Sequence, residues 1–123
     1  MGQASAFVPI ALVVEDDEMQ REMVAMLLEE SEMDVIQCEN AEAALSVLKK
    51  MGALVAIMFT DVNLTGEIDG VQLAHFAHQH YPNIHVIVTS GVELTKQLPE
   101  GTTFMPKPWV ALELLREAVR SQH

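Results

Sequence analysis

Five side chains able to take part in chemistry each follow a short apolar run of the chain. In chain order they are the adjacent pair Glu15 and Asp16, then Asp61, Thr89 and Lys107. Clustered carboxylates repel one another and favour a bound cation, and ligands that are all oxygen point to a hard ion such as Mg²⁺. An ammonium and a hydroxyl beside them suit the oxygens of a phosphoryl group, which a carboxylate can itself accept as an acyl phosphate.

The elements that must position these side chains follow from the hydropathy pattern. Short apolar runs without alternation predict buried strands over residues 10–14, 34–38, 54–60, 84–88 and 102–105. Apolar residues at helical spacing predict helices over residues 17–30, 40–50 and 70–80, at most a short helix over 91–98, and a last helix that starts at Pro108. This alternation predicts a doubly wound α/β fold whose parallel sheet brings the strand ends to one edge.

The apolar stripes of the first and last helices predict which faces pack against the sheet. In the first helix the stripe consists of Met19, Met23, Met26 and Leu27, and we expect the methionines to fill the core. In the last helix the stripe consists of Leu112, Leu115, Ala118 and Val119. Asn40 is expected to cap the second helix.

Length and charge limit the classes of protein that the chain can belong to. The 123 residues fit one domain, predicted over 1–123 with residues 1–8 as a flexible N-terminal extension. Eighteen acidic residues against seven basic ones, a net charge of -11, weigh against nucleic acid or a membrane as direct partners. The lone Cys38 and an N-terminus without a secretion signal predict a reducing, cytoplasmic setting.

The motifs at the strand ends resemble those of the response-regulator receiver domain of two-component signalling. They follow one another along the chain in the order and with the spacing that this family has. The matching segments are Leu12-Val13-Val14-Glu15-Asp16-Asp17, Thr60-Asp61-Val62-Asn63-Leu64, Asp69-Gly70, Val88-Thr89-Ser90-Gly91 and Met105-Pro106-Lys107-Pro108-Trp109. The resemblance implies a five-stranded parallel sheet of order 2-1-3-4-5 flanked by helices. The segment between Thr89 and Lys107 is short for the family, so we expect a shortened fourth helix.

The resemblance also implies a role for each residue of the site. Asp61 would be the phosphoacceptor and Lys107 its partner, with a cis bond between Lys107 and Pro108. Mg²⁺ would be bound by Asp16, by Asp61, by the backbone carbonyl of Asn63 and, through water, by Glu15. Thr89 and Phe104 would form the switch, although Phe104 lacks the hydroxyl of the tyrosine common at that position.

The function implied is that of a phosphorylated signalling module. A sensor histidine kinase or a histidine phosphotransfer protein would supply the phosphoryl group, and a downstream protein would bind the switched surface of a monomer or weak homodimer. The module would not be an enzyme beyond slow self-dephosphorylation. There are two alternatives. One is a haloacid-dehalogenase-like phosphatase, which Asp61-Val62-Asn63-Leu64-Thr65 favours, although Asn63 stands in place of the acid–base aspartate. The other is a receiver-like binding module that works without phosphorylation.

Overall fold

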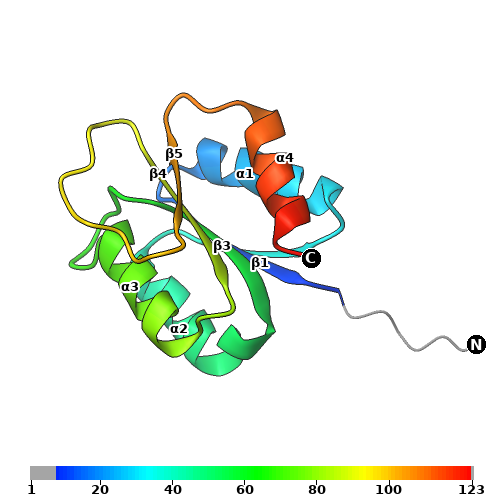
Figure 1. Cartoon of the computed structure of the whole chain (residues 1–123), viewed down its shortest axis with the longest axis horizontal. Helices are drawn as coiled ribbons and strands as arrows, with labels where there is room; N and C mark the ends of the chain where they lie inside the picture. The colour runs from blue at the N-terminus through cyan, green and yellow to red at the C-terminus, as the bar shows by residue number, and fades with distance from the viewer. Residues whose placement is uncertain (1–7, 123) are drawn as a thin grey trace, which may run out of the picture.

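Five parallel strands form one sheet in the predicted order β2-β1-β3-β4-β5 (Figure 1). The computed structural model describes residues 8–122, and its strands are β1 (Ile10–Val14), β2 (Asp34–Cys38), β3 (Val55–Asp61), β4 (His85–Ser90) and β5 (Thr103–Pro106). The register pairs Val14 with Thr60, and Asp61 with Thr89. The carboxyl ends of the three central strands are therefore level, and the side chains there gather at one edge of the sheet.

Helices cover both faces of this sheet. They are α1 (Glu18–Glu30), α2 (Ala41–Met51), α3 (Gly70–His80) and α4 (Ala111–Arg120), and a short 3-10 helix, η1 (Gly52–Leu54), leads into β3. Figure 1 shows α1 and α4 on one face and α2 and α3 on the other. Each face buries its own apolar cluster, one around Leu48 and Leu73 and the other around Leu28 and Leu114. Nowhere in residues 8–122 is a helix both long and apolar enough to cross a bilayer.

Three helices begin at a residue whose side chain caps them. The carboxylate of Asp17 accepts the Gln20 N–H at 2.9 Å, and the amide oxygen of Asn40 accepts the Ala43 N–H at 2.8 Å, as predicted for Asn40. Asp69 caps α3 through a reciprocal pair of bonds with Gln72. These caps satisfy N–H groups that have no partner within the helix, and so they fix where each helix starts.

The shortened fourth helix predicted between residues 91 and 98 is absent from the structure, which has no helix between β4 and β5. A helix of so few residues is marginal in water, and Pro99 disfavours a helical conformation at Leu98. The Ser90 hydroxyl bonds to the N–H and the carbonyl of Val92, and these bonds hold the chain in a turn. Of the predicted N-terminal extension over residues 1–8, only Val8 lies within the described residues.

The predicted packing faces of α1 and α4 are only partly right: Ala118 is buried and Leu27 packs against the core, but the other predicted residues are mostly exposed. The residues that α1 buries are Val24, Ala25 and Leu28, whereas Met19, Met23 and Met26 are 82%, 49% and 59% exposed. The last helix starts at Ala111, not at Pro108, and it buries Leu114 and Ala118 while Leu112 and Val119 stay exposed. Both helices carry two apolar stripes, so hydropathy alone does not select the inner one. In α4 the rotation is fixed by Trp109, whose ring packs edge-on against Phe59 with centroids 5.6 Å apart.

Truncating two leucines of α4 tests which face is buried. Leu114→Ala is expected to lower the free energy of unfolding by about 2–5 kcal/mol, because it opens a cavity in a fully buried position. Leu112→Ala, on the exposed side, is expected to change it by less than about 0.5 kcal/mol. Urea unfolding of dilute protein, followed by circular dichroism, measures both. Equal losses from the two variants would contradict the assigned rotation of α4.

Candidate functional site

Asp61 lies at the last position of β3, with its carboxylate buried at the carboxyl edge of the sheet. Its backbone is held on two sides. The Thr60 hydroxyl donates to the Asp61 carbonyl oxygen at 2.9 Å, and a Cβ at Gly70 would lie only 2.0 Å from that oxygen. Gly70 is therefore needed at the start of α3 because no larger residue leaves room for the backbone of Asp61. The main chain thus fixes the position of the carboxylate.

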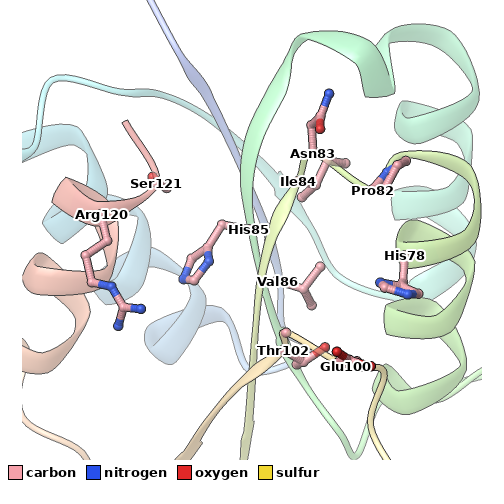
Figure 2. Close-up of a pocket in the computed structure, with 11 residues that line it drawn as sticks. His78, Pro82, Asn83, Ile84, His85, Val86, Glu100, Thr102, Arg120 and Ser121 are labelled. Carbon is pink, nitrogen blue, oxygen red and sulfur yellow. The ribbon is translucent and has the colours of Figure 1, made fainter. Parts of the chain in front are cut away.

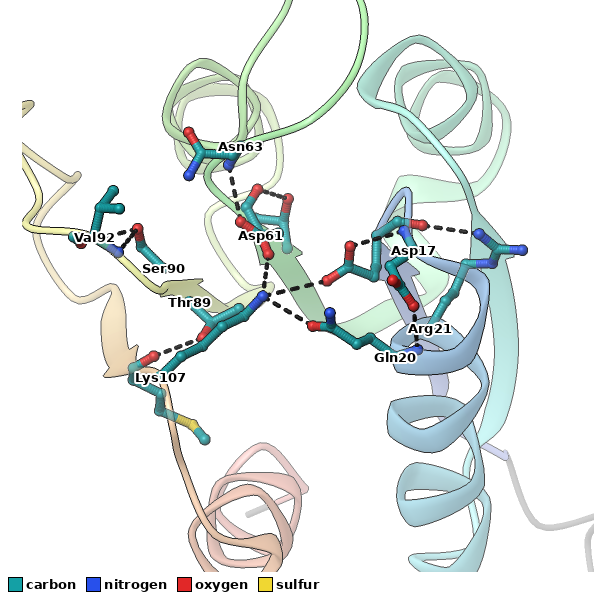
Figure 3. Close-up of polar contacts among 12 residues, drawn as sticks. Asp17, Gln20, Arg21, Asp61, Asn63, Thr89, Ser90, Val92 and Lys107 are labelled. Carbon is teal, nitrogen blue, oxygen red and sulfur yellow. Dashed lines mark hydrogen bonds and ion pairs between the residues drawn. The ribbon is translucent and has the colours of Figure 1, made fainter.

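Both oxygens of the Asp61 carboxylate accept hydrogen bonds (Figure 3). The Asn63 N–H donates to Oδ1 at 2.9 Å, and Lys107 Nζ donates to Oδ2 at 2.5 Å. The lysine follows β5, and its own backbone N–H donates to the Ser90 carbonyl at 2.9 Å. The Lys107–Pro108 peptide bond is cis, as the resemblance implies. Residues 46 positions apart in the sequence therefore form one ion pair at the sheet edge.

The ammonium of Lys107 has three acceptors in reach. Besides Asp61, the amide oxygen of Gln20 in α1 accepts from Nζ at 2.9 Å, and Glu15 Oε1 lies 3.7 Å away. Partial burial alone would lower the pKa of Lys107, but the hydrogen bond and charge of Asp61 and the charge of Glu15 raise it above its ordinary value. The side chain therefore stays positively charged at neutral pH and compensates the buried carboxylates.

Glu15 is the second buried carboxylate of the pocket, only 3% exposed. Burial raises the pKa of Glu15 to about 7, and the neighbouring carboxylates of Asp16 and Asp61 add to this rise. The Asp17 N–H, which donates to Oε2 at 3.0 Å, opposes it. Arg21 donates to the Glu15 carbonyl at 2.9 Å and not to the carboxylate. Burial is therefore the main reason that the pKa of Glu15 is raised, and the nearby carboxylates add to it.

The chemistry of this donor set fits a hard divalent cation. Glu15, Asp16, Asp61 and the Asn63 carbonyl offer oxygen alone, and a cation would stabilise the charged form of Glu15, which burial and then the neighbouring carboxylates disfavour. Asp16 is exposed at the rim. No group of three His, Cys, Asp or Glu side chains within residues 8–122 is already arranged around a common metal position.

The two residues predicted to switch lie on neighbouring strands, Thr89 on β4 and Phe104 on the edge strand β5. Thr89 is fully buried, and its hydroxyl donates to the Met105 carbonyl of β5 at 2.7 Å. Phe104 is half-buried and packs against the cluster beneath α2 and α3. In this structure the Thr89 hydroxyl is therefore bonded to β5 and not to Asp61.

Two contacts of the site have no signal that sequence reasoning detected. Gln20 bonds to Lys107, yet a single glutamine in the first turn of a polar helix looks like any solvated residue. Thr60 bonds to the Asp61 carbonyl, but within an apolar strand it reads only as a β-branched residue. Gly70, by contrast, belongs to the Asp69-Gly70 segment that resembles the family. The sequence therefore drew attention to this glycine, although it did not show that Gly70 approaches the Asp61 carbonyl.

A separate cavity of about 330 Å³ lies at the opposite, amino end of the strands (Figure 2). His78 of α3 and Arg120 of α4 line it from the two faces of the sheet. His85 also lines it, and its Nε2 lies 2.6 Å from Glu117 Oε1, which also accepts from Thr103, while Oε2 of Glu117 accepts from Arg120. Burial alone would raise the pKa of Glu117, but these partners hold it below its ordinary value of 4.5. The cluster connects α4 to β4 and β5, far from Asp61.

The comparisons with known proteins identify the family. A profile described as the response regulator receiver domain matches residues 11–119, which is most of the chain. The chain therefore belongs to the response regulator receiver family.

Relatives of known name agree with this assignment. A cyclic di-GMP phosphodiesterase of Thermotoga maritima is 33% identical over 110 residues, which are 85% of this chain and 28% of that protein. The chain thus spans less than a third of that relative. The solved receiver domain of an HD domain-containing protein from Pseudomonas fluorescens Pf-5 is 25% identical, covers 94% of both chains and superposes with a TM-score of 0.82. The receiver domain of the hybrid histidine kinase CckA is 27% identical over 93% of this chain and 99% of that one, with a TM-score of 0.79.

The lowered pKa of Glu117 predicts how stability changes in acid. A carboxyl group with a depressed pKa stabilises the fold above its ordinary pKa, and this contribution is lost as the pH falls. Between pH 5 and pH 3 the free energy of unfolding should therefore fall less for Glu117→Gln than for the wild type. Urea unfolding at several pH values measures this change in the free energy of unfolding with pH. The control is Glu100→Gln at an exposed position, which should show the same change as the wild type. An unchanged slope for Glu117→Gln would contradict the role assigned to the cluster.

Proposed function

We propose that the chain is a phosphoacceptor that takes a phosphoryl group from a phosphohistidine onto Asp61 and then alters a protein-binding surface. The observation that carries this proposal is the contact between the buried Asp61 carboxylate and Lys107, 2.5 Å apart beside a second buried carboxylate. Family membership supports the same reading. The charge of the transferred group would be offset by the ammonium of Lys107 in a pocket that excludes much of the solvent.

In the proposed reaction one oxygen of Asp61 attacks the phosphorus in line. The new O–P bond forms as the N–P bond to the donor histidine breaks, and the leaving imidazole takes a proton from solvent. Lys107 moves from the carboxylate to a phosphoryl oxygen and offsets its charge. The Asn63 N–H and the clamped backbone of Asp61 keep the acceptor oriented.

Mg²⁺ is the proposed cofactor. Asp16, Asp61 and the backbone carbonyl of Asn63 would bind it directly, with Glu15 acting through water. When bound, the ion supplies positive charge beside the transferring group. Lys107 would supply further positive charge through its contacts with Asp61 and Glu15.

Phosphorylation would be read out through Thr89 and Phe104. We propose that the acyl phosphate draws the Thr89 hydroxyl away from Met105, with which it now bonds, and that Phe104 repacks in response. Because Phe104 has no hydroxyl, this repacking depends on shape alone. The result is a shift in population of the surface formed by β5, α4 and the segment after β4.

The partners proposed follow from the same chemistry. A sensor histidine kinase or a histidine phosphotransfer protein would donate the phosphoryl group, and a downstream protein would bind the altered surface. The setting would be cytoplasmic. Each transfer leaves Asp61 phosphorylated, and only slow hydrolysis of the acyl phosphate would free it for another. The module would therefore not be an enzyme with turnover.

Phosphorylation from a small donor tests the role of Asp61. Acetyl phosphate with Mg²⁺ should add one phosphoryl group to the wild type, and beryllofluoride with Mg²⁺ should change the fluorescence of Trp109, the only tryptophan, which follows the Lys107-Pro108 pair. Asp61→Asn should show neither change, because it lacks the acceptor oxygen. Asp34→Asn, at the exposed start of β2, should respond as the wild type does. Intact mass and fluorescence titration are the measurements, and an unresponsive wild type would refute the proposal.

Titration with Mg²⁺ tests the metal site separately. Asp16→Asn should weaken Mg²⁺ binding by about tenfold or more, because it removes one charged ligand. Glu22→Gln, an exposed change in α1, should leave the affinity unaltered. Calorimetry or Trp109 fluorescence reports the binding. Equal affinities for wild type and Asp16→Asn would show that the metal is placed wrongly, whatever the outcome at Asp61.

A further inference from the structure

Gln20, in the first turn of α1, reaches the site through the ammonium of Lys107. Its amide oxygen accepts from Lys107 Nζ at 2.9 Å (Figure 3). The oxygen must be the amide atom that faces the ammonium, because a lysine can only donate. Both side chains line a surface groove of about 480 Å³ together with Trp109. The contact therefore lies on the side of the site that is open to solvent.

The start of α1 holds Gln20 in a fixed place. The carboxylate of Asp17 accepts the backbone N–H of Gln20 at 2.9 Å. The next residue, Arg21, donates to the Glu15 carbonyl at 2.9 Å and to the amide oxygen of Gln37 at 3.2 Å. These bonds tie the first turn of the helix to the loop after β1 and to β2. The amide of Gln20 is therefore presented to the ammonium from a braced position.

Gln20 differs in charge from the other two side chains around the ammonium. Asp61 and Glu15 are carboxylates, whose oxygens lie 2.5 Å and 3.7 Å from Lys107 Nζ. A carboxylate holds an ammonium more strongly than an amide does, because both partners of the bond are then charged. Gln20 therefore gives Lys107 an acceptor without adding a charge that competes with Asp61.

We infer that Gln20 is a positioning residue for phosphoryl transfer, which holds the Lys107 ammonium in place while it passes from Asp61 to the transferring group. The inference rests on the proposed function of Asp61. The oxygen that attacks phosphorus must give up its bond to the ammonium as the O–P bond forms. With Gln20 beside it, the ammonium keeps an acceptor during this exchange and stays at the site of transfer. Without Gln20, Glu15 is the remaining acceptor, and its charge draws the ammonium away from the phosphoryl oxygens.

Removing the acceptor oxygen without changing the length of the side chain is the first test. Gln20→Met replaces the amide by a weakly accepting thioether and has a similar helix propensity. Acetyl phosphate is the donor, and its O–P bond breaks to release acetate as the bond to Asp61 forms. At saturating Mg²⁺ the phosphorylation rate of Gln20→Met should be about threefold to tenfold below that of the wild type, as for the loss of a solvent-exposed hydrogen bond to a charged group. Its Mg²⁺ affinity should be unchanged.

Adding a charge at the same position is the second test. Gln20→Glu keeps an acceptor, but its carboxylate should capture the ammonium and slow phosphorylation by about tenfold or more. The same variant should bind Mg²⁺ more tightly than the wild type, because Lys107 is drawn from Asp61 and one more negative charge lies near the cation. Slower transfer combined with tighter Mg²⁺ binding is not expected from a mere distortion of α1.

The matched control is Gln37→Met, which removes an exposed glutamine oxygen that bonds to Arg21 and leaves the Gln20–Lys107 contact intact. It should be phosphorylated at the wild-type rate. Intact mass against time gives the rate, calorimetry gives the Mg²⁺ affinity, and circular dichroism checks the fold of each variant.

The outcomes separate this inference from the proposed function. If the wild type is labelled and Gln20→Met is labelled equally fast, or Gln37→Met is slowed as much as Gln20→Met, the inference is wrong while the role of Asp61 stands. A Gln20→Glu variant that binds Mg²⁺ no more tightly than the wild type also overturns it. A wild type that takes no label refutes the proposed function and this inference together.

Discussion

The contact between Asp61 and Lys107 is the interaction on which the rest of the site depends. A buried carboxylate is costly unless a positive partner and hydrogen bonds compensate it, and these two residues come from strands that are not neighbours in the sheet. The sheet order places β4 between them, so the lysine reaches across a strand. Its own backbone is bonded to Ser90 at the end of that strand. The site thus requires three strands to end at the same level, which is what the parallel register provides.

One ammonium faces two buried carboxylates, and this imbalance organises the chemistry. The pKa of Glu15 is raised mainly by burial, and the pKa of Lys107 is raised, against the effect of its own burial, by Asp61 and Glu15. A pocket in that condition gains from any further positive charge that enters. Most of the other acidic side chains are exposed to solvent, where repulsion is weak, and only Glu15 and Asp61 are buried.

The sequence predicted the sheet and the strand-end residues well for a physical reason. Strands buried on both faces are uninterrupted apolar runs, so Asp61 and Lys107 stand out as the polar residues that end them. Helix rotation was harder, because α1 and α4 each carry two apolar stripes and the inner one is chosen by packing partners such as Trp109. The absence of a helix after β4 could not be predicted, because it involves bonds of the Ser90 hydroxyl to the backbone of Val92 that the sequence does not show. The contact of Gln20 with Lys107 depended on tertiary distance alone, for which a single sequence carries no signal.

The short last strand has a consequence for how copies of this protein can meet. β5 is at the edge of the sheet and ends in Pro106, which has no N–H to offer a further strand. A long, flat edge would invite other chains to extend the sheet into an aggregate. Here a strand of only four residues that ends in a proline restricts that route at the β5 edge of the sheet and favours contacts between side chains there. Such contacts can form and dissociate reversibly while the sheet itself stays finite.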